Sequence, residues 1–240
     1  MNPEGGLVFD VHWDGRTVSE VKLSSVRPLQ LVQLLRGKTV TEGLRLLGML
    51  YRICGVAQRY AGLRAWQQAS DVEVVTAVQQ AQQLLVKLES LREHLWQVLV
   101  AWPQLLGKKP EQNENLLLLS SMLPEAEQAL FADGQSMTPA ARLDMKNQSF
   151  EVLLQQLQQL IEQHICGMRI EQWLAMNSMV ELLAWSEENS GPAAQMIAYI
   201  SEHEYSSLGS NEKDICGLPL LAEEKLLENF GSDAREQFVA

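Results

Sequence analysis

The longest helical pattern in the chain covers residues 71–102 and reads DVEVVTAVQQAQQLLVKLESLREHLWQVLVAW. Its apolar residues recur at spacings of three and four, which is the period of an α-helix with one buried face. Asp71 can cap the first turn, and Pro103 marks the end because proline disrupts a helix interior. The pattern predicts one long helix and a mostly α fold. Its apolar positions are Val74, Val75, Val78, Ala81, Leu85, Leu88, Leu91, Leu95 and Val98.

The same period continues after a polar break at residues 107–114, where a subdomain boundary can lie. Pro192 suits the first position of a helix, because its missing N–H is not needed there. Further helices are predicted over residues 115–131 (kinked or divided by Pro124), from 138, over 150–174 and 173–186, from 192 and over 220–229.

The N-terminal part predicts a different structure. Residues 7–25 alternate apolar and polar side chains around Asp14-Gly15, which is typical of a β-hairpin with a two-residue turn. A short helix is predicted over residues 29–36, and residues 43–57 are apolar nearly all round, which predicts one buried helix. The expected architecture is a long antiparallel helix bundle with an N-terminal β-hairpin. We expect a single domain over residues 1–240, helical from residue 28 onward.

The composition excludes several classes of function. The chain has 240 residues and a formal net charge of −11, which argues against nucleic-acid binding and against adhesion to anionic membranes. No uninterrupted apolar run reaches the length of about 18 residues that a membrane span requires. No basic segment followed by an apolar one marks a secretory leader. The three cysteines form no CxxC pair, so a cytoplasmic location is expected.

One segment has unusual local chemistry, the run from Arg52 to Gln58 around Cys54. A neighbouring arginine favours the thiolate, which is the form that binds metals and attacks electrophiles. The glycine after the cysteine leaves room for a ligand beside the sulfur. The alternative is that Cys54 is a small apolar residue within a buried helix.

The remaining cysteines and histidines form no recognisable site. Cys166 and Cys216 each precede a glycine, and both are expected to be structural thiols unless the fold brings the three cysteines together. His94 is expected to be a hydrogen-bonded structural residue rather than a ligand. His12, His164 and His203 stand alone in the sequence, and no common hydrolase or nucleotide-binding motif occurs.

Residues 52–56, Arg-Ile-Cys-Gly-Val, resemble the start of the Arg-Ile-Cys-Gly-Val-Cys-x-x-x-His signature of nickel–iron hydrogenase large subunits. Residues 3–11 are similar to that family's N-terminal segment, and residues 36–43 to the stretch ahead of its signature. The resemblance covers roughly residues 3–106 and implies a hydrogenase-large-subunit-like fold. It places Glu4 at a glutamate near the hydrogenase active site, although a solvated terminal glutamate explains Glu4 equally well.

The departures from that signature concern the metal ligands. The second cysteine of the first pair is Ala57 here, the following histidine is Ala61, and the C-terminal Cys-x-x-Cys pair does not occur. One thiolate of four cannot hold nickel in the hydrogenase geometry, because thiolates select and fix that metal. The chain is therefore not expected to be an enzyme, and no nickel is expected.

Cysteine followed by Gly-Val-Ala-Gln is similar to the hydrogenase expression/formation proteins of the HupK/HoxV type. That resemblance implies a non-catalytic maturation scaffold that transiently holds the Fe(CN)2(CO) unit, with Cys54 as the iron ligand and Glu4 beside it. The implied partners are a hydrogenase maturation chaperone, the iron-delivery complex and the large-subunit precursor. Two alternatives stay open, a metal-free adaptor for chaperones or subunits and a subunit of a divergent redox enzyme.

Overall fold

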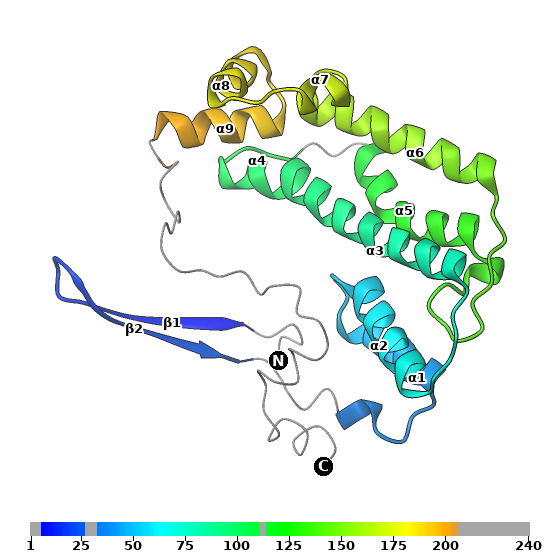
Figure 1. Cartoon of the computed structure of the whole chain (residues 1–240). Helices are drawn as coiled ribbons and strands as arrows, with labels where there is room; N and C mark the ends of the chain where they lie inside the picture. Colours follow the sequence, from blue (N-terminus) through cyan, green and yellow to red (C-terminus); the bar gives the residue numbers. More distant parts are fainter. Residues whose placement is uncertain (1–5, 27–32, 111–113, 204, 206–240) are drawn as a thin grey trace. The chain divides into compact units, whose positions relative to one another are not determined.

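A computed structural model describes residues 6–26, 33–110, 114–203 and 205 of the chain. The protein is mostly helical and has an N-terminal antiparallel hairpin, as the sequence predicts (Figure 1). Its contacts divide the chain into two units, residues 1–198 and 199–240. The single domain over residues 1–240 stays a prediction. Glu4, Cys216 and the helix predicted over 220–229 lie outside the described residues.

The hairpin consists of β1 (Leu7–Trp13) and β2 (Val18–Ser25), with Leu7 opposite Ser25. Four residues connect the strands, so the predicted two-residue turn is wrong. The reason is the Asp14 carboxylate, which accepts hydrogen bonds of 2.8 Å from the backbone N–H groups of Thr17 and Arg16 and closes a wider loop. These bonds hold the pKa of Asp14 below its ordinary value. Every residue of both strands is exposed.

The single helix predicted over residues 43–57 is wrong, because the chain forms two helices there. These are α1 (Val40–Leu50), which a Thr39–Glu42 capping box starts, and α2 (Gly55–Ala69). The turn between them lets their backbones approach closely. A Cβ added at Gly55 would lie 2.9 Å from the carbonyl oxygen of Gly48, so the close approach requires glycine at position 55. The two packed helices bury Leu44 of α1 and Leu63 of α2, while Met49 stays exposed.

The long helix begins at α3 (Thr76–Trp96) and continues through a π-helical turn (Gln97–Ala101) into α4 (Trp102–Leu105). Asp71 does not cap it, which corrects the prediction. Asp71 has a φ of +50°, so it belongs to the turn after α2, and Val75 is the N-cap residue of α3. Pro103 lies two residues before the last residue of α4, so the long helix ends close to the predicted position.

The remaining helices follow the sequence with two corrections. No helix forms at residue 138, since Phe131 and Leu143 pair across a loop there, and Gly167 with φ +67° interrupts the helix predicted over 150–174. The helix predicted over 115–131 forms without a break at Pro124. The elements are α5 (Glu114–Leu130), a 3₁₀ turn (Ala132–Gly134), α6 (Asn147–Ile161), a π-helical turn (Glu162–Cys166), α7 (Ile170–Leu174), α8 (Met179–Glu188) and α9 (Pro192–Glu202).

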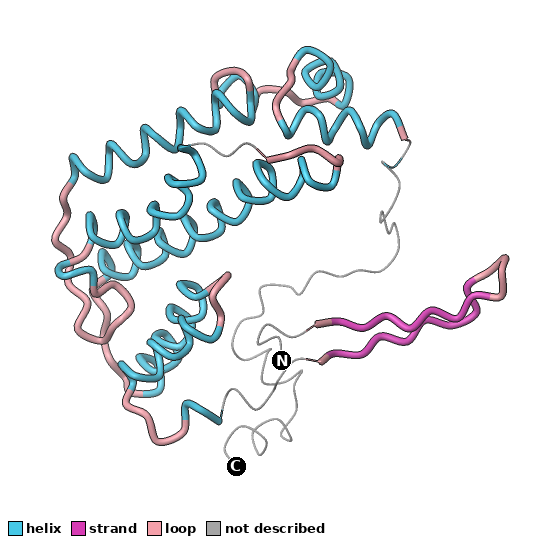
Figure 2. Tube along the Cα trace, turned by 180° about the vertical axis from the view of Figure 1, so that it is seen from behind, coloured by secondary structure: helices cyan, strands magenta, loops and turns pink. Residues whose placement is uncertain are grey.

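The main core lies where α5 packs between α3 and α6, an arrangement visible in Figure 1 and from behind in Figure 2. Its fully buried side chains include Leu119 and Met122 of α5 and Leu153 of α6. A second cluster surrounds Trp185 of α8. Among the described helices, none is both long and apolar enough to cross a membrane.

Candidate functional site

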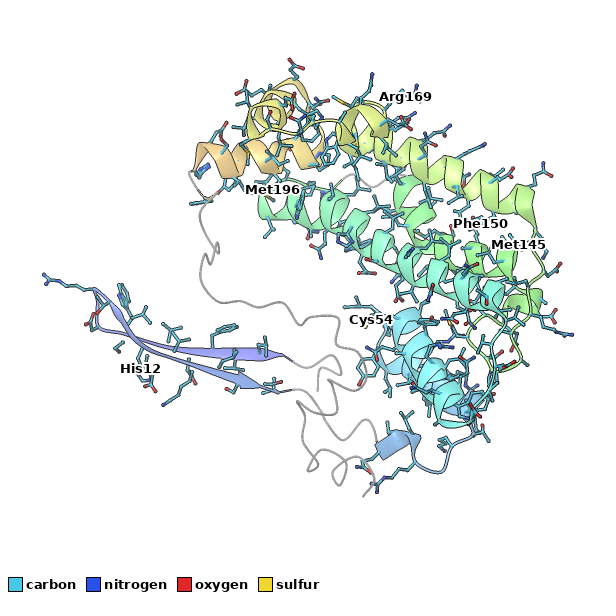
Figure 3. The ribbon with its side chains drawn as sticks, in the orientation of Figure 1. His12, Cys54, Met145, Phe150, Arg169 and Met196 are labelled. Atoms are coloured by element: carbon cyan, nitrogen blue, oxygen red, sulfur yellow. The ribbon has the colours of Figure 1, made fainter. Side chains whose placement is uncertain are left out.

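Cys54 is the N-cap residue of α2, in the turn between α1 and α2 (Figure 3). Its side chain is half-buried, and the Gln58 amide nitrogen, one turn along the same helix, lies 3.8 Å from the sulfur. The interpretation of Cys54 as an apolar residue inside a buried helix is therefore wrong. The thiol stands at a helix end and keeps part of its surface accessible, which a metal ligand or nucleophile requires.

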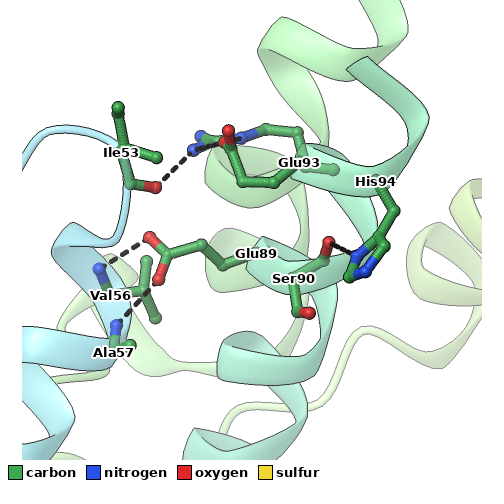
Figure 4. Close-up of polar contacts among 8 residues, drawn as sticks. Ile53, Val56, Ala57, Glu89, Ser90, Glu93 and His94 are labelled. Atoms are coloured by element: carbon green, nitrogen blue, oxygen red, sulfur yellow. Dashed lines mark hydrogen bonds and ion pairs between the residues drawn. The ribbon is translucent and has the colours of Figure 1, made fainter. Parts of the chain in front are cut away.

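Glu89 of α3 holds the start of α2 in place of a side-chain cap. Its carboxylate accepts hydrogen bonds from the backbone N–H groups of Val56, at 2.8 Å, and Ala57, at 2.9 Å (Figure 4). Glu89 is only 4% exposed, so these charge-assisted bonds form away from water, where they are strong and costly to lose. A negative charge also complements the positive end of the α2 dipole.

Sequence reasoning missed Glu89, although a signal for it exists. Glu89 follows Leu85 by four positions and Leu88 by one, so it falls on the apolar face of the long helix. A carboxylate on a buried face needs a partner, and unpaired backbone N–H groups at the start of another helix are a suitable one. The sequence alone does not say which helix start that is.

Arg92, one turn further along α3, fixes the other side of the same turn. Its guanidinium donates to the carbonyl oxygen of Ile53 at 3.1 Å and pairs with the Glu93 carboxylate at 2.6 Å. Two side chains of α3 therefore bracket Cys54, with Arg92 bonded to the residue before it and Glu89 to residues after it. The thiol is placed by a neighbouring helix and not only by its own turn.

The other candidate residues do not join Cys54. His94 is exposed, and its Nδ1 lies 2.7 Å from the Ser90 carbonyl oxygen, on the side of α3 away from the turn (Figure 4). Cys166 is buried at the end of the π-helical turn after α6, and burial raises the pKa of its thiol. Both match the structural roles that the sequence predicts. Within the described residues, no three His, Cys, Asp or Glu side chains gather as a metal site.

Comparison with known proteins gives two relatives. The chain is 32% identical over 137 residues to the hydrogenase expression/formation protein HupK of Azotobacter vinelandii, over 57% of this chain and 40% of the relative. It is also 32% identical over 99 residues to the hydrogenase expression/formation protein HupV of Azotobacter chroococcum mcd 1, over 41% of this chain and 29% of the relative. The chain is related to hydrogenase expression/formation proteins.

This result confirms the resemblance inferred from residues 52–58, but it covers only part of the relatives. The matched region spans less than half the length of either one. No protein-family model matches the chain, and no solved structure does. The likeness to the hydrogenase large-subunit fold therefore stays a prediction.

Proposed function

We propose that the chain is a non-catalytic accessory protein of nickel–iron hydrogenase maturation in the cytoplasm. It transiently holds the Fe(CN)2(CO) unit, or the complex that delivers it, before transfer to the large-subunit precursor. The iron unit is cargo in this proposal. The observation that carries it is the position of Cys54, a half-buried thiol in Arg-Ile-Cys-Gly-Val that two side chains of α3 hold at the start of a helix.

The ligand chemistry of the turn suits temporary binding. Cys54 offers one sulfur, and no set of three ligating side chains accompanies it within the described residues. A single thiolate binds iron more weakly than four, and weak binding suits a protein that must release its cargo. Cyanide and carbon monoxide already occupy three positions on the iron, so one protein thiolate is a sufficient first attachment.

The remaining coordination positions on the iron must be filled by groups from a partner protein. The proposed partners are a maturation chaperone with the iron-delivery complex, followed by the large-subunit precursor. Glu4 stays a proposed neighbour of the iron unit.

Infrared spectroscopy tests the proposal directly. The full chain is purified anaerobically from cells that make hydrogenase, and the CN and CO stretching region is recorded. We expect bands in the wild type and in Cys166→Ser, and their loss in Cys54→Ser. Cys166→Ser is the matched control, because it makes the same chemical change at a buried thiol. Bands of equal strength in Cys54→Ser would contradict the role of Cys54.

The adaptor function is supported by the hairpin. Leu7, Phe9 and Trp13 of β1 are 56%, 62% and 68% exposed, which gives a partner protein an apolar surface to bind. An iron-free wild-type protein that hydrogenase maturation nevertheless requires would favour the adaptor over the scaffold. Hydrogen-dependent dye reduction by the purified chain would instead support the redox-enzyme alternative and contradict both.

A further inference from the structure

A pocket of about 520 Å³ beside the Cys54 turn is lined by four arginines. Each comes from a different segment: Arg45 from α1, Arg52 from the turn, Arg59 from α2 and Arg92 from α3. The chain as a whole carries a net charge of −11, so positive charge is concentrated here against its general excess of acidic residues. The volume is typical of pockets that take small molecules.

The arginines are incompletely paired. Within the described residues, Arg45 and Arg52 make no hydrogen bond or ion pair, although the charge of Arg45 does act on Glu42. Arg59 reaches the Glu127 carboxylate at 3.8 Å, but its Nε is buried without a hydrogen-bond partner. A buried N–H of a charged group that lacks a partner is unfavourable. The ion pair with Glu127 therefore does not satisfy the Arg59 guanidinium completely.

The nearby carboxylates have other partners, although Glu127 and Glu93 also pair with Arg59 and Arg92 of the pocket. Glu89 is the lining carboxylate, and both its oxygens accept backbone N–H groups of α2. Glu127 accepts from the backbone N–H and the hydroxyl of Ser136, and Glu93 pairs with Arg92. The pocket wall therefore keeps an excess of guanidinium donors, with the hydroxyl-bearing residues Thr41 and Thr138 as further lining.

We propose that this pocket binds a phosphate-type oxyanion with at least two negative charges, either free or as the ester group of a small molecule. Guanidinium groups match the oxygens of phosphate in a two-bond fork. A carboxylate carries one negative charge and two oxygens. Four arginines can interact with an anion that has more charge and more oxygen atoms than a carboxylate. The inference does not depend on iron binding at Cys54, whose sulfur does not line the pocket.

Isothermal titration calorimetry of the full chain, in a buffer free of phosphate, tests the site with pyrophosphate. We expect one molecule to bind per chain, more weakly as salt rises. The double variant Arg45→Gln/Arg52→Gln should weaken binding at least about tenfold, because two charge-assisted contacts are lost. Both side chains are exposed and make no bond within the described residues, so the fold should persist. Circular dichroism checks this.

The matched control is Arg142→Gln/Arg169→Gln, which removes the same charge from exposed positions outside the pocket. An equal loss in this control, or no binding of pyrophosphate by the wild type, overturns the proposal. Orthophosphate and adenosine diphosphate identify the source: tighter binding of the diphosphate ester than of either inorganic ion assigns the anion to a larger molecule. Cys54→Ser should bind as the wild type does, so failure of the iron proposal leaves this one separately testable.

Discussion

The same three residues, Ile-Cys-Gly, occur at Ile53–Gly55, Ile165–Gly167 and Ile215–Gly217. The first two triplets lie within the described residues, and the fold uses them at opposite ends of helices. Cys54 precedes the first turn of α2. Cys166 closes the π-helical turn after α6, where Gly167 in a left-handed conformation ends the helix. The first cysteine therefore lies near the backbone N–H groups that begin a helix, and the second lies near the carbonyl groups that end one. The two helix ends have opposite partial charges.

The two glycines also serve different purposes. Gly55 has ordinary helical geometry, and its lack of a side chain lets the backbone of Gly48 approach. Gly167 has a φ of +67°, which other residues adopt only with strain. An identical triplet thus meets a packing requirement in one place and a conformational one in the other.

The surroundings separate the two thiols further. Cys54 stays half-buried, in a turn that Glu89 and Arg92 fix from outside. Cys166 is 4% exposed, and its carbonyl oxygen accepts a 2.6 Å hydrogen bond from the indole N–H of Trp185. The difference in burial between these cysteines therefore comes from the helix end and the neighbouring element, and the shared triplet does not determine it.

The largest expected effect comes from removing the support of the Cys54 turn. Glu89→Ala leaves two N–H groups of α2 without their partner in a buried place, so the free energy of unfolding should fall by about 3 kcal/mol. Urea denaturation followed by circular dichroism measures this. Glu93→Ala is the control, since its more exposed ion pair with Arg92 should cost less than about 1 kcal/mol. Equal losses in the two variants would show that the Glu89 cap is not the stabilising element.

The second-largest loss of stability is expected from replacing the glycine after Cys166. Gly167→Ala forces a Cβ into a left-handed residue and into the Asn189 side-chain oxygen, which should cost about 2 kcal/mol. Gly107→Ala separates the two causes, because Gly107 has a similar φ of +70° with nothing near its added Cβ. We expect about 1 kcal/mol there, from backbone strain alone. Melting experiments on both variants give the comparison, and a larger loss at Gly107 would contradict it.

Thiol labelling tests the contrast in reactivity. Iodoacetamide should modify Cys54 in the folded protein at least about tenfold faster than Cys166, because burial both shields the Cys166 sulfur and disfavours its thiolate. Peptide mass spectrometry over a time course assigns each site. In urea the two rates should converge, and a difference that persists there would mean that the local sequence, and not the fold, sets reactivity.

The smallest expected effect is a pH slope. Burial, with the charge of Glu162 as the second cause, raises the pKa of Cys166 above its ordinary 9.0. The unfolded chain then loses this proton first as pH rises. The stability contributed by the protonated thiol is complete below pH 9.0 and is lost as the pH rises through the folded pKa. Cys166→Ser should flatten the alkaline fall in stability that urea denaturation measures.

Hydrophobic periodicity predicted most of the helices, because burying one face of a helix leaves a repeat that can be counted along the chain. Periodicity did not predict every helix boundary. Residues 43–57 are apolar on every side, so the pattern could not show that the chain turns back at residues 51–54. Asp71 gave a misleading boundary, since residues that cap helices also occur in turns.

The sequence by itself determined the net charge, which depends on composition alone. It also determined the helical class, the hairpin and the resemblance of the segment from Cys54 to Gln58 to hydrogenase maturation proteins, because these depend on residues close together in the chain. Only the tertiary structure decided that Glu89 and Arg92 hold the Cys54 turn and that four arginines line one pocket. Glu89 lies 33 residues from Val56 in the chain, and contacts over such separations are set by how helices pack. Helix packing depends on the shapes of whole faces, which no local pattern encodes.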